Sequence, residues 1–150
     1  PCYQWNRAIV VPEGHPLLTL NRPLTLADIG RWPIITYDFA FTGRSKINRA
    51  FADAGVEPNV VLTAIDTDVI KTYVNIGLGI GIIAAMAFEP ERDHGLRLID
   101  AAHLFQPSTT RIGIRRDAYL RGFAYHFIEL FAAHLTRKEV DKVMFAGEED

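Results

Sequence analysis

The residues best suited to binding chemistry lie in the stretch DFAFTGRSKINRAF, at positions 38–51. Thr42 offers a hydroxyl, Gly43 lets a ligand approach the backbone closely, and a run with helical spacing follows them. The first amides of a helix have no partner within the helix and carry a partial positive charge. The stretch therefore predicts a small anion pocket, with Arg44 as an added charge and Phe41 as a wall.

The same residues also have a plainer explanation. Thr42 would only cap the helix, by accepting a hydrogen bond from the amide of Ser45, and Arg44 would point into solvent. The residues alone leave both explanations open. A second helix start, Asp66 with its neighbours at 67–68, is expected at the same edge, and its carboxylates suit an amine or a hydroxyl. Together the two helix starts predict a small zwitterionic or amino-acid-like ligand.

The motifs of common enzyme classes are missing from the sequence. It contains no GxGxxG followed by an acidic residue at ribose-binding distance, no GxxxxGK[ST] and no GxSxG. The glycines of GLGIGIIA, at 77–84, lie between a helix and the next strand, where they predict a tight turn and not a nucleotide site. None of the five histidines has the spacing of a metal pair, and Cys2 has no histidine near it in sequence. We expect no catalytic residues, no metal and no cofactor.

The elements that must position the pocket alternate along the chain. Short apolar runs predict strands at 7–11, 34–37, 59–64, 79–84 and 96–99, and the segments between them have helical spacing. This order predicts an α/β fold with a parallel sheet and helical crossovers. Ligands of such sheets bind beyond the carboxyl ends of the strands, which places the loop after strand 34–37 at the ligand edge. One short helix is expected at 24–29 with Thr25 as its cap. The next helix is expected to bury Ile47, Ala50, Phe51 and Ala54. The third is expected to bury Val69, Ile70, Tyr73 and Val74.

The last third of the chain has a different pattern. Residues 109–115 alternate as a half-buried strand does, and residues 118–135 predict one long helix. A helix this apolar needs a surface to lie on, either the preceding α/β unit or a segment outside the chain. Its predicted apolar face consists of Phe123, Phe127, Leu130, Phe131 and Leu135.

Composition narrows the class of protein. Of the 150 residues 49% are hydrophobic, the formal net charge is −2, and the sequence pI of about 6.2 does not favour direct contact with nucleic acid. A single cysteine allows no internal disulfide, which fits the cytoplasm. PCYQWNR at the start does not resemble a signal peptide, and no apolar run has the length of a membrane span. The missing initial Met suggests a fragment or a processed product.

Four segments carry a resemblance to a known family. They are PCYQWNRA at 1–8, FTGRS at 41–45, TAIDTDVIKTYVNIGLGIGIIA at 63–84, and STTRIGIRRDAYLRGFAYHFIELFAAHLT at 108–136. In this order the chain resembles the effector domain of LysR-type transcriptional regulators, specifically their CysB-like subgroup, which controls sulfur assimilation and cysteine biosynthesis genes. The likeness covers nearly the whole chain.

The resemblance implies an effector domain like a periplasmic binding protein, with two α/β subdomains joined by two crossing strands and the ligand in the cleft. Residues 1–107 would be subdomain II with the first crossover, residues 108–136 the return strand and C-terminal helix of subdomain I, and residues 137–150 a tail. The first half of subdomain I would be absent. The family binds DNA through an N-terminal winged helix-turn-helix, which this chain lacks, and forms homodimers or homotetramers. No membrane partner is implied.

The resemblance also implies a ligand. The inducer in the subgroup is N-acetylserine, derived from O-acetylserine, and sulfate or thiosulfate can also act on it. Carried over by motif, the contacts would be Thr42 and Trp5, with Tyr3 and Phe41 as neighbours and Asp66 from its place at a helix start. Gln4 and Ala40 depart from the subgroup pattern. The alternative is a periplasmic solute-binding protein for sulfate or a related small anion, which would share the fold but would need an export signal.

Overall fold

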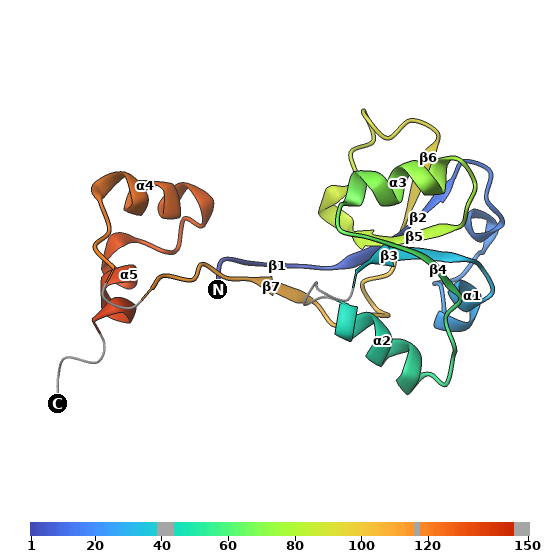
Figure 1. Cartoon of the computed structure of the whole chain (residues 1–150), viewed down its shortest axis with the longest axis horizontal. Coiled ribbons are helices and arrows are strands. Elements are labelled where there is room, and N and C mark those ends of the chain that lie inside the picture. Colours follow the sequence, from blue (N-terminus) through green and yellow to red (C-terminus); the bar gives the residue numbers. More distant parts are fainter. Residues whose placement is uncertain (39–43, 116–117, 146–150) are drawn as a thin grey trace. The chain divides into compact units, whose positions relative to one another are not determined.

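The computed structural model describes residues 1–38, 44–115 and 118–145 and divides the chain into two compact units. We call Trp5–Ser108 the sheet unit and Pro1–Gln4 with Thr109–Asp150 the terminal unit. The chain passes from one unit to the other through β1 (Tyr3–Trp5) and β7 (Ser108–Thr110), which form a two-stranded sheet (Figure 1). Each unit is described below by itself.

A five-stranded sheet in the order β4-β3-β5-β2-β6 forms the centre of the sheet unit. β3 pairs in parallel with β4 and β5, whereas β2 pairs antiparallel with β5 and β6. The predicted parallel sheet is therefore mixed. The helical connection between β2 and β3 does not force a parallel direction here, since the two strands are not neighbours in the sheet. The strands are β2 (Arg7–Pro12), β3 (Ile34–Tyr37), β4 (Val60–Ala64), β5 (Ile80–Ala84) and β6 (Leu96–Asp100).

Helices cover both faces of this sheet, which gives two buried layers. α1 (Leu26–Gly30) and α2 (Arg44–Asp53) lie on one face and α3 (Thr67–Asn75) on the other (Figure 1). Successive strand residues point to opposite faces, so that Ile34 joins the first layer and Ile35 the second. Two short 3₁₀ helices, η1 (Pro16–Thr19) and η2 (Ala85–Ala87), complete the unit.

Most predicted elements of the sheet unit are confirmed, but the buried face of α3 was predicted only in part. Ile70 and Val74 are fully buried, whereas Val69 and Tyr73 are 41% and 38% exposed. The third buried residue of the helix is Lys71, whose ammonium lies 2.9 Å from the Asp93 carboxylate. A lysine can lie on a buried face when a carboxylate pairs with it, and this pairing is not readable from helical spacing.

The glycines of GLGIGIIA form the expected turn from helix to strand. Gly77 has a φ of 83°, which ends α3, and β5 begins three residues later. Gly81 has a packing role: a Cβ there would lie 2.5 Å from Cγ1 of Val10 and 3.0 Å from Cγ2 of Ile70. The missing side chain therefore lets α3 pack closely onto the sheet.

The terminal unit differs from the predicted long helix. Residues 118–135 do not form one helix. α4 spans Gly122–Phe131, and after a turn α5 spans Arg137–Met144. The predicted strand 109–115 is regular only as far as Thr110. The turn lets Val140 of α5 pack against Ile128 of α4. Of the predicted apolar face, Leu135 packs against this small core, whereas Phe123 and Leu130 are 73% and 74% exposed.

The N-terminus of α1 provides a test of stability against pH. Hydrogen bonds from Arg22, at 2.7 Å and 2.9 Å, and from Thr25 hold the pKa of Asp28 far below its ordinary value of 3.8. Because the folded state lowers this pKa, Asp28 stabilises the protein above pH 3.8, and the effect is lost as the pH falls below that value. We expect Asp28→Asn to cost about 1 kcal/mol of unfolding free energy at pH 7 and less near pH 3. Asp53→Asn is the control, because Asp53 forms only an exposed pair with Arg49 at 4.0 Å. If Asp28→Asn lowered the unfolding free energy equally at pH 7 and pH 3, the role given to the Asp28 carboxylate would be contradicted.

The close packing at Gly81 gives a second test. Gly81→Ala should lower the free energy of unfolding by about 1–3 kcal/mol, because Val10 of β2 and Ile70 of α3 must move to admit the methyl group. Gly122→Ala is the matched control, since its Cβ would meet nothing within 4 Å. Denaturant unfolding of both variants checks the expectation. Equal midpoints would show that the α3 contact is not tight.

Candidate functional site

The predicted anion pocket can be described through the residues on either side of it. Thr42, Gly43 and Phe41 lie in 39–43, outside the described residues. Tyr37 and Asp38 precede this segment at the carboxyl end of β3, and Arg44 follows it as the first residue of α2. These flanking residues define the geometry of the site.

Tyr37 joins three elements at this edge of the sheet. Its hydroxyl accepts a hydrogen bond from the backbone N–H of Ala84, at 3.1 Å, and lies 2.8 Å from Oγ1 of Thr67. Ala84 is the last residue of β5, and Thr67 is the first residue of α3. The ends of β3 and β5 and the start of α3 therefore meet at one point, as the predicted ligand edge requires.

Arg44 points into the protein, which decides between the two orientations left open by the sequence. Its side chain is buried, Nε donates to Oδ1 of Asn48 at 2.9 Å, and Nη1 donates to the carbonyl oxygen of Tyr37 at 2.9 Å. Burial lowers the pKa of Arg44, and the Asp38 carboxylate opposes that effect. A guanidinium remains charged in a protein, so a fixed positive charge lies at the end of β3.

Two acidic residues lie at the same edge, and they have different partners. Asp38 donates its backbone N–H to the carbonyl of Ala64 at 3.0 Å, and its Oδ2 lies 3.3 Å from Oγ1 of Thr63. The exposed Asp66 caps α3, since its carboxylate accepts the N–H of Asp68 at 2.7 Å. The cap accounts for Asp66 without a ligand, and its predicted contact with one stays a prediction.

Trp5 and Tyr3 are neighbours in sequence but belong to different units. Trp5 is half-buried in the sheet unit, and the Arg7 guanidinium carbon lies 5.1 Å from the centroid of its ring. Tyr3 belongs to the terminal unit, where its ring centroid is 5.6 Å from that of Phe131. The structure thus gives each of these predicted ligand residues an aromatic or cationic neighbour in its own unit.

Sequence reasoning missed Tyr37 and Arg7 as residues of the site. Arg7 is only 1% exposed although it stands at the start of the apolar run RAIVV. Its position carried a signal, because a charge heading a buried strand needs partners. Tyr37 ends its strand at the predicted ligand edge, but only the tertiary structure shows that its hydroxyl reaches Ala84 and Thr67.

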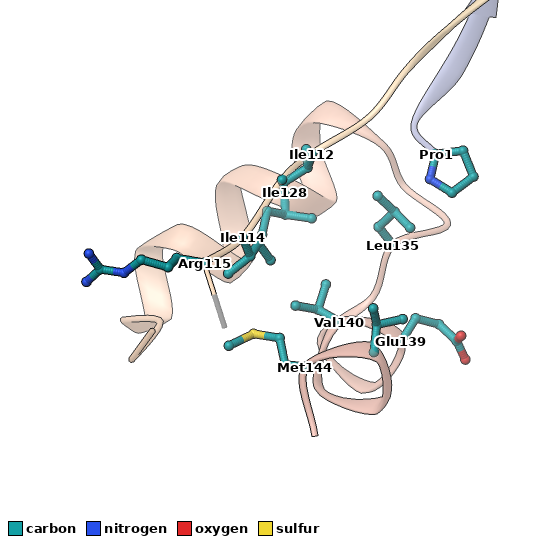
Figure 2. A pocket seen from close by; sticks show the side chains of 11 residues that line it. Pro1, Ile112, Ile114, Arg115, Ile128, Leu135, Glu139, Val140 and Met144 are labelled. Carbon is teal, nitrogen blue, oxygen red and sulfur yellow. The ribbon is translucent and has the colours of Figure 1, made fainter. Parts of the chain in front are cut away.

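A separate pocket of about 440 Å³ lies in the terminal unit, between α4, α5 and residues 112–115. Figure 2 shows mostly aliphatic side chains around it, with Glu139 and Arg115 as its charged residues. Only Pro1 represents the N-terminal segment there, and none of the predicted ligand residues lines the pocket. Its apolar lining does not suit a small charged ligand.

Metal and membrane chemistry find no support in the described part of the chain. No group of three or more His, Cys, Asp or Glu side chains gathers among residues 1–38, 44–115 and 118–145. Three histidines serve local structure there: His15 caps η1, His103 lies 2.8 Å from the carbonyl of Leu24, and His134 lies 3.0 Å from that of Pro1. None of the described helices is long and apolar enough to cross a membrane.

The edge brings together one cationic, two hydroxyl and one carboxylate group. They are the buried guanidinium of Arg44, the hydroxyls of Tyr37 and Thr67, and the carboxylate of Asp38. Cation and hydroxyls suit a carboxylate or sulfate, and Asp38 suits a donor such as an amide or hydroxyl. The amino-acid-like ligand predicted from the two helix starts stays a prediction.

Comparison with known proteins gives one consistent family. The family model for the LysR substrate binding domain matches residues 1–136. The chain is 58% identical over 140 residues to the HTH-type transcriptional regulator SsuR of Burkholderia cenocepacia. The match covers 93% of the chain and 45% of SsuR. The chain is 54% identical over 144 residues to CysB of the same organism, covering 96% of the chain and 46% of that protein. The chain thus spans about half the length of these relatives.

Solved structures show the same fold. The cofactor-binding domain of the Cbl transcriptional regulator superposes with a TM-score of 0.89 at 40% identity, covering 96% of the chain and 63% of that domain. The effector-binding domain of QuiR, solved in complex with shikimate, superposes with a TM-score of 0.67 at 17% identity over 92% of the chain and 64% of that domain. The second likeness supports the fold alone.

The tyrosine at the edge gives a testable expectation. Tyr37→Phe keeps the ring but removes the acceptor for the Ala84 N–H, so it should lower the free energy of unfolding by about 1–2 kcal/mol. Tyr73→Phe, in an exposed side chain of α3, is the matched control and should have little effect. Chemical denaturation of both variants measures the difference. If Tyr37→Phe were as stable as the control, the Tyr37 hydroxyl would not stabilise this edge of the sheet.

Proposed function

The chain belongs to the LysR substrate-binding domain family, and we propose that it senses a small effector for a transcriptional regulator of sulfur assimilation and cysteine biosynthesis genes. The effector is N-acetylserine, O-acetylserine or a sulfate-like anion, bound at the carboxyl edge of β3 and β5. The chain acts as a binding module and not as an enzyme. It works in the cytoplasm, as part of a homodimer or homotetramer.

The observation that carries this proposal is the inward orientation of Arg44. A positive charge taken out of water and fixed by the Tyr37 carbonyl and Asn48 favours an anionic group in the adjoining segment. Thr42 and Gly43 belong to that segment and supply the predicted hydroxyl and backbone approach. The effector carboxylate or sulfate is expected there, with Trp5, Tyr3 and Phe41 as its apolar neighbours and Asp66 near its donor groups.

DNA binding belongs to another part of the regulator in this proposal. The formal net charge of −2 and the sequence pI of about 6.2 do not favour a phosphate-binding surface on this chain. The family's winged helix-turn-helix would contact the DNA, and effector binding here would change the arrangement of the subunits. This chain then contributes sensing alone.

The proposal is tested by calorimetric titration of N-acetylserine, and separately of sulfate, into the full-length gene product. Thr42→Ala should weaken N-acetylserine binding roughly tenfold or more, because a hydrogen bond to a charged ligand group is lost. Thr19→Ala, which alters an exposed threonine of η1, should bind like the wild type. Equal affinities for Thr42→Ala and the wild type would reject the assignment of Thr42. Absence of binding of both probes to the wild type would reject the proposed effectors.

A further inference from the structure

Arg7 is a charge buried in a strand that is otherwise apolar. Its side chain is 1% exposed, and the next four residues of β2 are equally buried. Burial lowers the pKa of Arg7, an effect that Tyr37 opposes. Taking a guanidinium out of water costs several kcal/mol unless other groups compensate, and well-packed apolar residues often replace such charges without loss of stability. A structural role in packing alone therefore does not explain this arginine.

The contacts of Arg7 join two segments about a hundred residues apart. Nη1 donates to the carbonyl of Gln106 at 3.3 Å, Nη2 donates to Oγ of Ser108 at 3.2 Å, and the guanidinium lies over the ring of Trp5. Trp5 is the first residue of the sheet unit and Ser108 is its last. Arg7 thus holds the points at which both connecting strands leave the sheet unit.

The same residue lies next to the candidate site. In the antiparallel register Arg7 pairs with Ala84, and the N–H of Ala84 donates to the hydroxyl of Tyr37. Tyr37 in turn contacts Thr67 at the start of α3 and Arg44 at the start of α2. Arg7, which contacts both connecting strands, therefore lies at a strand end next to the proposed effector edge.

We infer that Arg7 is a positioning residue, which orients Trp5 for the effector and fixes both connecting strands to the effector-binding edge of the sheet unit. Its effect on the effector passes through Trp5, and this part of the inference rests on the proposed function. The orientation of Trp5 by Arg7 does not depend on any effector.

The test uses the full-length gene product labelled with 5-fluorotryptophan and observed by ¹⁹F NMR. The Trp5 resonance is assigned by its loss in Trp5→Phe, and that of Trp32 by its loss in Trp32→Phe. Arg7→Met keeps an unbranched side chain but removes the charge and the hydrogen bonds to Gln106 and Ser108. We expect it to shift the Trp5 resonance and to increase its H₂O–D₂O solvent shift, with the Trp32 resonance unchanged.

Two further variants make the result specific. Arg7→Lys keeps a cation but cannot form the same paired donors, so its Trp5 resonance should lie between those of the wild type and Arg7→Met. Arg49→Met, at an arginine whose side chain is 77% exposed, is the matched control and should leave Trp5 unchanged. If Arg7→Met does not fold, Ser108→Ala, which removes one acceptor, should shift the Trp5 resonance in the same direction.

The affinity for N-acetylserine separates a positioning role from a purely structural one. Folded Arg7→Met should bind this probe roughly tenfold more weakly, with partial recovery in Arg7→Lys and none of the loss in Arg49→Met. An unchanged Trp5 resonance in Arg7→Met, or in Ser108→Ala if the first does not fold, overturns the inference. A shifted resonance with unchanged affinity overturns its link to the effector. If the wild type does not bind N-acetylserine, the proposed effector fails and the resonance still decides the role of Arg7.

Discussion

The pairing of β2 with β5 on one side and β6 on the other is the constraint on which the sheet unit depends. β2 is the strand that runs opposite to its neighbours, and the four residues after Arg7 are at most 1% exposed. β2 comes first of the five strands in sequence, yet it lies between β5 and β6, which come last. The sheet is therefore complete only when the two ends of the unit have come together. The pairing of β2 with β5 also places Arg7 at the end of β5, where the proposed effector edge begins.

The electrostatics of the edge follow from this arrangement. Arg44 and Arg7 are both buried, and the guanidinium of each donates a hydrogen bond to a backbone carbonyl. These bonds hold each positive charge in a fixed place. Charges held in this way need no reorganisation when an anion arrives, unlike exposed lysines or arginines, which lose side-chain freedom. The carboxylate of Asp38 lies close enough to Arg44 to oppose the lowering of its pKa by burial, so it limits the positive potential at this edge.

The two units differ in how much apolar surface they bury. The sheet unit has a core layer on each face of its sheet, whereas the core of α4 and α5 is a small cluster around Tyr125, Ile128 and Val140. Since burial of apolar area is the main stabilising term, most of the stability of the chain comes from the sheet unit. Phe123 and Phe127 of α4 are mostly exposed and bury little apolar area in this chain.

Local pattern by itself determined the strands and helices of the sheet unit, the caps at Thr25 and Asp66, and the turn at Gly77, because these depend on spacing and on residues close in sequence. It also limited the 38–44 segment to a choice between a helix cap and an anion pocket. Only the tertiary structure decided the antiparallel direction of β2, the break between α4 and α5, and the inward orientation of Arg44. The direction of β2 depends on pairing between residues far apart in sequence, and the break between α4 and α5 on packing such as that of Val140 on Ile128, neither of which periodicity encodes. The partners of Arg44, Asn48 and Tyr37, are close in sequence, but spacing does not show whether its side chain turns toward them or toward solvent.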